Sequence, residues 1–218
     1  MKSEDIFAMG LGLHAPWEVK SVSFEETQDG KELHIHIDFS CGARFINDKG
    51  DAVSAYDTEE KEWRHLNFFE HRCYLHCRVP RIRMSDGKVR MVEVPWARAG
   101  SGFTLLFEAY TMKLIESEMP VSSVARHTKV TAPRIWRVFH HWISKARARI
   151  DLSRVRRIGI DETSSRKGHN YITNFVDLDT RGLIYSTEGK GEATIENFVK
   201  GLENRGGDRK NIEVVSMD

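Results

Sequence analysis

The sequence has no long hydrophobic run, and this excludes one class of protein at once. Its uninterrupted apolar stretches are only a few residues long, whereas a helix that crosses a bilayer needs roughly 20 apolar residues. The first five residues, MKSED, are polar and acidic, which is unlike the start of a secretory signal or a transit peptide. We therefore expect a cytoplasmic protein that has no membrane segment.

Cysteine and net charge are scarce as well. Three cysteines cannot form a complete disulfide framework, and they are one short of a four-thiolate zinc site. The 33 basic and 32 acidic residues leave a net charge of +1, so the total neither favours nor excludes a nucleic-acid partner. The distribution is informative, because residues 101–160 contain eleven basic and four acidic residues, a local charge of +7.

The first hundred residues predict a small β module. Residues 32–39 alternate apolar and polar side chains with a period of two, as a half-buried strand does. Residues 73–80 and 89–95 are two further strand candidates, and turn-forming residues at 85–88 join them. The whole composition, 40% hydrophobic and 30% charged over 218 residues, is typical of a globular protein with one or two domains.

Residues 101–150 have helical periodicity instead. Apolar residues recur at helical spacing over 103–115, and a second helix fits 121–127. A third, longer helix is expected to begin after Thr131, an N-cap residue, with Pro133 in its first turn, where the missing N–H of proline does no harm. The last two helices and their short connection predict a helix-turn-helix, which places its second helix in the DNA major groove.

Small apolar residues can form the core of this helix-turn-helix. An ordinary helical pair with a basic, solvated face is the alternative interpretation. The aromatic residues Trp136, Phe139 and Trp142 are expected to pack in the core rather than to stack on bases. The expected small core consists of Val124, Ala125, Val130, Ile135 and Val138.

The residues left outside that core are polar and basic. Side chains near the start of the second helix of a helix-turn-helix reach base edges. Arginine and lysine contacts displace counterions from DNA, so binding should weaken steeply as salt is added. The residues expected to contact DNA are Lys129, Thr131, Arg134, Arg137 and Lys145.

The last third of the chain returns to strands separated by turns. Three strand candidates, at 156–160, 171–176 and 182–186, follow one another closely and should pair antiparallel. The amphipathic stretch 193–204 predicts a helix. A strand at 211–216 should then lie parallel to a neighbour, because a helical crossover leads to it.

Two carboxylates follow strands of this expected sheet. Asp161 comes directly after the strand that ends at Ile160, and Asp218 comes after the last strand. If these strands are neighbours, the two carboxylates lie side by side and repel each other unless a cation is present. Mg²⁺ prefers oxygen ligands, and two such ions can assist the cleavage of a phosphodiester. The expected strand order is that of a ribonuclease H-like sheet.

Several of these segments carry a family resemblance. Residues 159–173, 176–179 and 214–218 resemble the catalytic domain of ISL3-family insertion-sequence transposases. Residues 63–69 and 94–98 resemble the zinc-binding N-terminal module of that family, and the expected helix-turn-helix lies where the family has one. The resemblance extends over the chain from about residue 30 onward.

The resemblance implies a DDE transposase, which cuts and transfers DNA strands at the ends of a mobile element with Mg²⁺. Asp161 would be the first catalytic carboxylate and Asp218 the second, both as Mg²⁺ ligands, while the third, a glutamate, would lie beyond residue 218. We therefore expect a chain truncated at its second catalytic carboxylate. Glu162 is expected to be a solvated residue, and Asp177 and Asp179 are expected to form a turn.

The N-terminal module departs from the family pattern. The family places cysteine pairs in the regions that correspond to residues 47–50 and 84–87, and these are absent here. Cys41 lies just before the first of these regions. A metal-free β module, stabilised by packing instead of zinc, is one interpretation. The other is a rearranged zinc site that uses Cys73, Cys77 and either His76 or His71.

Together these observations predict an α+β multidomain protein. It would comprise a zinc-ribbon-like β module (1–100), a helix-turn-helix segment (101–150) and a partial ribonuclease H-like domain (151–218). The expected partners are double-stranded DNA at insertion-sequence inverted repeats and either a second copy or a full-length transposase, in the cytoplasm and nucleoid of a bacterium. A DNA-binding regulator without catalysis and a non-functional pseudogene product are the alternatives.

Overall fold

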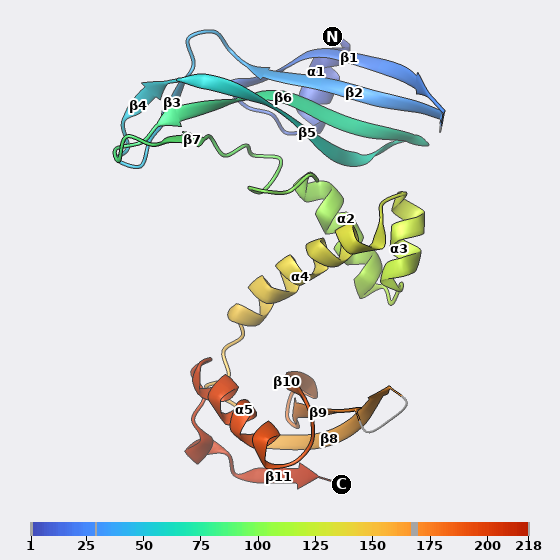
Figure 1. Cartoon of the computed structure of the whole chain (residues 1–218), viewed down its shortest axis with the longest axis vertical. Coiled ribbons are helices and arrows are strands. Elements are labelled where there is room, and N and C mark those ends of the chain that lie inside the picture. The colour runs from blue at the N-terminus through green and yellow to red at the C-terminus, as the bar shows by residue number, and fades with distance from the viewer. Residues whose placement is uncertain (1, 29, 167–169, 218) are drawn as a thin grey trace. The chain divides into compact units, whose positions relative to one another are not determined.

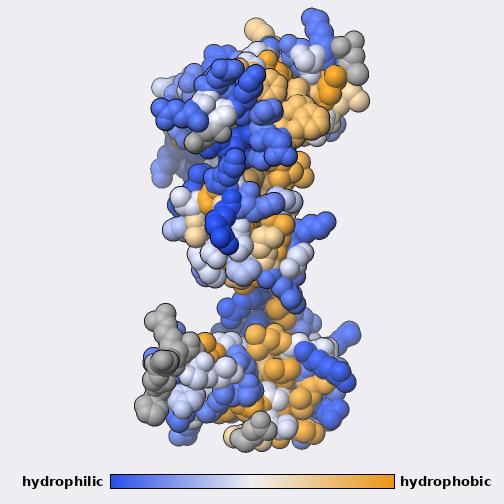
Figure 2. Space-filling model, turned by 90° about the vertical axis from the view of Figure 1, so that its right-hand side faces the viewer, coloured by the Kyte–Doolittle hydropathy of each residue, from blue (hydrophilic) through white to orange (hydrophobic). Residues whose placement is uncertain are grey.

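The computed structural model describes residues 2–28, 30–166 and 170–217. The chain forms two compact units, Met1–Val138 and Phe139–Asp218, which are described separately below. No helix among the described residues is both long and apolar enough to span a membrane. On the face shown in Figure 2, hydrophilic side chains cover much of each unit, with hydrophobic side chains exposed between them.

The first unit begins with a twisted sheet in the order β1-β2-β6-β5, with β7 paired to β6 (Figure 1). Strands β2 and β6 are parallel, and the other pairs in this sheet are antiparallel. A separate two-stranded hairpin is formed by β3 and β4. The elements are α1 (Ser3–Gly10), β1 (Trp17–Thr27), β2 (Gly30–Phe39), β3 (Arg44–Ile46), β4 (Ala52–Ser54), β5 (Asp57–Phe68), β6 (His71–Arg83) and β7 (Val89–Met91).

Alternation along the two central strands builds the core of this sheet. Leu33, Ile35 and Ile37 of β2 are buried, and they pack with apolar residues of β6 such as Leu75. The strands expected at 32–39 and 73–80 are therefore confirmed. The strand expected at 89–95 was predicted too long, because β7 ends at Met91.

Three helices complete the first unit and the start of the second: α2 (Leu105–Glu116), α3 (Val121–Thr128) and α4 (Ala132–Ala148). Helix α2 begins where the Thr104 side chain accepts a hydrogen bond from the Phe107 N–H at 3.3 Å. Helix α3 ends at Lys129, which adopts a left-handed conformation with φ of 54°. Backbone N–H groups of Arg134 and Ile135 bond to the Thr131 carbonyl, so α4 begins where it was expected.

The second unit has a four-stranded sheet in the order β10-β9-β8-β11 (Figure 1). Strands β8, β9 and β10 pair antiparallel, and β11 lies parallel to β8 after the helical crossover, as expected. Helix α5 packs on one face of the sheet, where the rings of Phe198 and Phe175 stack with their centres 4.2 Å apart. The elements are β8 (Arg157–Arg166), β9 (Asn170–Asp177), β10 (Gly182–Glu188), α5 (Glu192–Glu203), η1 (Arg209–Asn211) and β11 (Val214–Met217).

Candidate DNA-binding helices and carboxylate site

The small core between α2, α3 and α4 is the one the amphipathic pattern predicts. Val124 and Ile135 are completely buried, and Val138 is 1% exposed. Ala125 and Val130 are buried too. All five expected core residues therefore pack inside, as predicted.

The polar residues expected to contact DNA are exposed, with one exception. Thr131 and Arg137 are exposed near the start of α4, and Lys129 is exposed in the turn before it. Lys145 is exposed farther along α4, with its ammonium 5.3 Å from the centre of the Trp142 ring. The exception is Arg134, which is half-buried with its guanidinium 4.3 Å from the centre of the Phe103 ring.

One of the three aromatic residues of α4 that were expected to pack in the core does not do so. Trp136 is 45% exposed, so the expectation of core packing is wrong for this residue. Phe139 and Trp142 are partly buried. The segment that includes α3 and α4 is also strongly basic, since residues 121–149 contain seven arginines and lysines and no aspartate or glutamate. Such a segment has a positive potential that attracts phosphate groups.

Asp161 lies within a strand, although it was expected to follow one. Strand β8 continues to Arg166, because its pairing with β9 extends through Asp161↔Asn174 to the end of the hairpin. The carboxylate is exposed and accepts a hydrogen bond from the Thr163 hydroxyl at 3.0 Å. Alternation places Asp161 and Asn174 on the sheet face opposite α5, because Phe175, next in the strand, packs on that helix.

Two residues beside Asp161, Asn174 and Ser186, were not predicted from the sequence. Both lie in one row with Asp161 across β8, β9 and β10, and the Ser186 hydroxyl donates to the Asn174 side-chain oxygen at 2.8 Å. An asparagine in the middle of an otherwise strand-forming segment was the available signal. The row provides polar oxygen and amide groups beside the Asp161 carboxylate.

The other proposed carboxylate, Asp218, lies outside the described residues. Met217 pairs with Ile160, and these two residues immediately precede Asp218 and Asp161 in the sequence. The described part of the chain contains no group of three or more histidine, cysteine, aspartate or glutamate residues arranged to hold a metal ion. The Asp161 carboxylate has the donor chemistry that Mg²⁺ prefers, but it is a single described ligand.

The remaining acidic residues of the sheet behave as expected. Glu162 is exposed and pairs with Thr173, so alternation directs it to the opposite face from Asp161. Asp177 accepts hydrogen bonds from the Asp179 N–H and the Thr180 hydroxyl. Asp177 and Asp179 therefore form the turn between β9 and β10, as predicted.

The rearranged zinc set is not brought together. Cys73 and Cys77 of β6 point into the core, and burial raises the pKa of each thiol to about 12. Four strand positions separate them by about 13 Å, too far for two thiolates on one zinc ion. His76 lies on the opposite face, where its ring nitrogen is 2.8 Å from that of His34. Cys73 also shares its face with His71, but the spacing of the cysteines rules out that variant equally.

These features define a class of protein: a helix-turn-helix protein with a basic, acid-free pair of helices and a separate α/β unit that exposes a carboxylate. A family model described as the helix-turn-helix domain of transposase family ISL3 matches residues 92–143. A transposase model of the same family matches residues 158–218. The chain belongs to the ISL3 family of transposases.

Curated relatives are similar over most of this chain. The transposase for insertion sequence element IS1557 of Mycobacterium tuberculosis is 26% identical over 208 residues, covering 93% of this chain and 47% of the relative. The transposase for insertion sequence element IS1001 of Bordetella parapertussis is 27% identical over 186 residues, covering 82% and 42%. The chain thus spans about half the length of the curated relatives it matches. No solved structure matches the chain.

Proposed function

We propose that this chain binds double-stranded DNA at the terminal inverted repeats of an insertion sequence, as the DNA-recognition part of a transposase. The observation that carries the proposal is the surface of α3 and α4. The apolar positions of these helices are buried in the expected core, and residues 121–149 expose six arginines and lysines and contain no acidic residue. The helix-turn-helix family match and the printed names of the relatives support it.

Different residues of this surface have different proposed roles. Thr131 and Arg137 are exposed at the first turns of α4, where a helix-turn-helix reads base edges. Lys129 and Lys145 are exposed before and after this point, and a lysine contributes chiefly through phosphate contacts, which position the protein without reading sequence. Arg137 is the residue proposed to discriminate between base sequences.

The carboxylate of Asp161 is proposed to belong to a magnesium site together with Asp218. The register of β8 and β11 supports this, because the residues that precede the two aspartates are paired. Bound magnesium would supply charge stabilisation for phosphodiester cleavage. The residues of this chain contribute an exposed carboxylate of strand β8 that accepts a hydrogen bond from Thr163. In the whole enzyme this site would serve DNA transposition.

Fluorescence anisotropy with the full chain tests DNA binding. We expect a duplex with the element's inverted repeat to bind more tightly than a scrambled duplex, with affinity falling steeply as salt rises. Arg137→Ala should weaken binding by about 1–3 kcal/mol, if the arginine makes a bidentate contact with guanine. Arg44→Ala removes an exposed arginine of β3 and is the matched control. Absent or salt-insensitive binding contradicts the proposal.

A second candidate function is binding without cleavage, in which the chain occupies element ends as a regulator. The basic, acid-free surface of α3 and α4 supports this candidate, because DNA binding there does not depend on the Asp161 carboxylate. A nicking assay with Mg²⁺ or Mn²⁺ separates the candidates. Nicking that disappears in Asp161→Asn supports the transposase function, and binding without nicking supports the regulator.

The chain is further proposed to act with a protein partner in a bacterial cell. A second copy of the chain or a full-length transposase is the proposed protein partner, and the bacterial nucleoid is the proposed location. The proposed domains are the β module (1–100), the helix-turn-helix segment (101–150) and the partial ribonuclease H-like domain (151–218). Co-purification with a tagged full-length transposase on inverted-repeat DNA, compared with the same experiment without DNA, tests the partner.

A further inference from the structure

A series of stacked side chains connects α4 to the sheet of the first unit. We call it the arginine–aromatic stack, and it consists of Arg134, Phe103, Phe107, Arg64 and Tyr74. The Arg134 guanidinium lies 4.3 Å from the Phe103 ring centre, and Phe103 stacks on Phe107 at 4.8 Å with an interplanar angle of 8°. The Arg64 guanidinium lies 5.5 Å from the Phe107 ring centre and 5.4 Å from that of Tyr74.

The middle of the stack is closed to solvent and therefore to DNA. Phe103 is 5% exposed, Phe107 2% and Arg64 4%. The Arg64 guanidinium donates hydrogen bonds to the carbonyls of His65 and Cys73 and to the side-chain oxygen of Asn67. A guanidinium that has lost its water interacts more strongly with aromatic faces. Arg64 is therefore held between two rings by its own hydrogen bonds.

The backbone fixes the same segment to β5. The Arg64 N–H donates to the Gly102 carbonyl at 3.0 Å, and the Thr104 N–H donates to the Arg64 carbonyl at 3.1 Å. The ring nitrogen of His65 lies 2.9 Å from the hydroxyl of Thr104, the residue that caps α2. The hydrogen bonds on either side of Phe103 hold this residue in place, and its ring packs against the guanidinium of Arg134.

Gly102 leaves room for that guanidinium. A Cβ atom at this position would lie 3.3 Å from the terminal nitrogen of Arg134, closer than ordinary van der Waals contact. Arg134 thus packs against backbone and ring together. Arg137, three residues along α4, is exposed.

We propose that Arg134 is a positioning residue, which fixes α4 on the β module through the arginine–aromatic stack, while Arg137 contacts DNA. This inference rests on the proposed DNA-binding function. It assigns different roles to Arg134 and Arg137, although the sequence predicted that both contact DNA. It makes the β module part of the DNA-recognition unit, because the stack ends on Tyr74 of β6. DNA affinity then depends on Phe103, a residue that DNA cannot touch.

A double-mutant cycle on the full chain tests this assignment. We compare Arg134→Ala, Phe103→Leu and the double variant by anisotropy on the inverted-repeat duplex and by urea unfolding. Each single variant should weaken DNA binding by about fivefold, the size expected for losing one cation–π contact. The double variant should be no weaker than the weaker single variant, because both changes break the same contact.

The salt dependence supplies a readout that packing alone does not move. The slope of log affinity against log salt should be unchanged in Arg134→Ala, and it should fall by about one in Lys145→Ala, which loses a proposed phosphate contact. A slope reduced in Arg134→Ala, together with wild-type affinity in Phe103→Leu, overturns the proposal. Arg134→Met preserves the aliphatic stem and replaces Arg134→Ala if that variant does not fold.

The unfolding data keep the two proposals separable. If the wild-type chain binds no DNA, the proposed function fails, but the contact between Arg134 and Phe103 is still measured by the cycle in urea. Coupling of the two changes in the unfolding free energy supports the stack. Additive changes in that free energy, with or without DNA binding, show that Arg134 does not position α4 through Phe103.

Discussion

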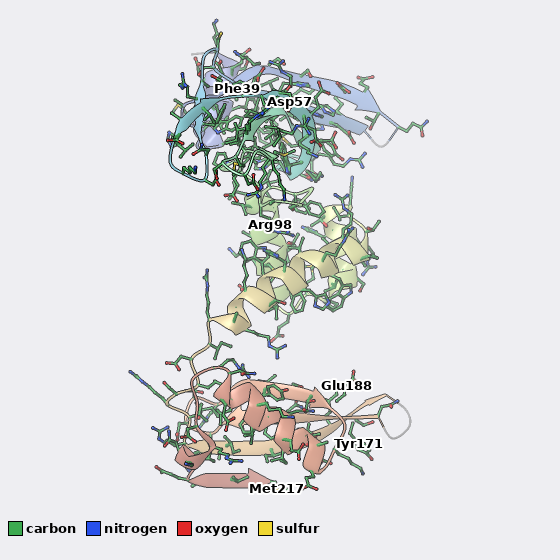
Figure 3. All side chains as sticks on the ribbon, turned by 60° about the vertical axis from the view of Figure 1, so that its left-hand side comes forward. Phe39, Asp57, Arg98, Tyr171, Glu188 and Met217 are labelled. Carbon is green, nitrogen blue, oxygen red and sulfur yellow. The ribbon has the colours of Figure 1, made fainter. Side chains whose placement is uncertain are left out.

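One ion pair in each unit shows how different the surroundings of charged side chains can be. In the first unit Glu108 of α2 is completely buried and is paired with Arg98, where the chain leaves the sheet and enters α2 (Figure 3). In the second unit Arg157 and Asp179 form an ion pair that is about half exposed on both sides. The first pair fixes the segment before α2 to that helix, whereas the second pair remains accessible to solvent.

The largest expected effect comes from removing Arg98. Its guanidinium Nε donates to a Glu108 carboxylate oxygen at 3.0 Å, and the Ser101 hydroxyl donates to the other oxygen at 2.6 Å. Arg98→Ala removes a charge-assisted hydrogen bond from a completely buried carboxylate, so the free energy of unfolding should fall by about 3–5 kcal/mol. Urea unfolding followed by tryptophan fluorescence measures the change.

The control for this prediction is the exposed pair of the second unit. Arg157→Ala should lower the unfolding free energy by no more than about 1 kcal/mol, because solvent already screens that pair. Combining Arg98→Ala with Glu108→Gln should restore part of the loss, since the buried group is then neutral. Equal effects of Arg98→Ala and Arg157→Ala would show that the two units do not differ in this way.

A pH titration tests the same contrast at His65. Burial, and secondarily the charge of Arg64, lowers the pKa of His65 from 6.5 to about 4. The unfolded chain therefore takes up the proton first, and stability is full above pH 6.5 and declines as the pH falls toward 4. The loss should reach about 3 kcal/mol, measured as the urea midpoint of the first unit at each pH.

His65→Gln should remove most of this pH dependence, although a smaller part should remain because burial also lowers the pKa of His76. His14→Gln changes an exposed histidine outside the sheet and should retain the wild-type curve. A His65→Gln curve that matches the wild type would mean that His65 is not the buried neutral group described here.

Backbone packing in the second unit gives the next largest effect. A Cβ at Gly207 would lie 2.4 Å from Leu202 Cδ1 and 3.0 Å from the Leu152 carbonyl oxygen. Gly207→Ala should therefore destabilise the second unit by about 1–3 kcal/mol. Hydrogen exchange of the β8 and β9 amides measures this locally. Gly10→Ala, which meets nothing within 4 Å at the end of α1, should leave exchange in the second unit unchanged.

The sequence predicts best where a side-chain pattern reports burial directly. Val124, Ile135 and Val138 follow one face of two helices, so their spacing predicted a core that the structure confirms. The order of β8, β9, β10 and β11 was also predictable, because short connections favour antiparallel neighbours and a helical crossover favours a parallel one. These are local signals that need no knowledge of the partner.

The sequence predicts poorly where polar residues are placed by tertiary contacts. Strand β5 was missed, since Glu59, Lys61 and other polar residues occupy many of its positions. The burial of Arg64 depends on two rings from other elements, which no local pattern reveals. The zinc set failed for a different, local reason, because regular alternation along β6 separates His76 from Cys73 and Cys77.

The smallest expected effect concerns Asp161, the exposed carboxylate of the second unit. Its described contact is the Thr163 hydroxyl, so Asp161→Ala should change the unfolding free energy by less than about 0.5 kcal/mol without divalent cations. Asp177, 7% exposed with two donors, is the matched control, and Asp177→Ala should cost about 1–3 kcal/mol. Urea unfolding compares them. If Asp161→Ala lowers the unfolding free energy as much as Asp177→Ala does, the Asp161 carboxylate stabilises the sheet, which would contradict a role as an exposed ligand group.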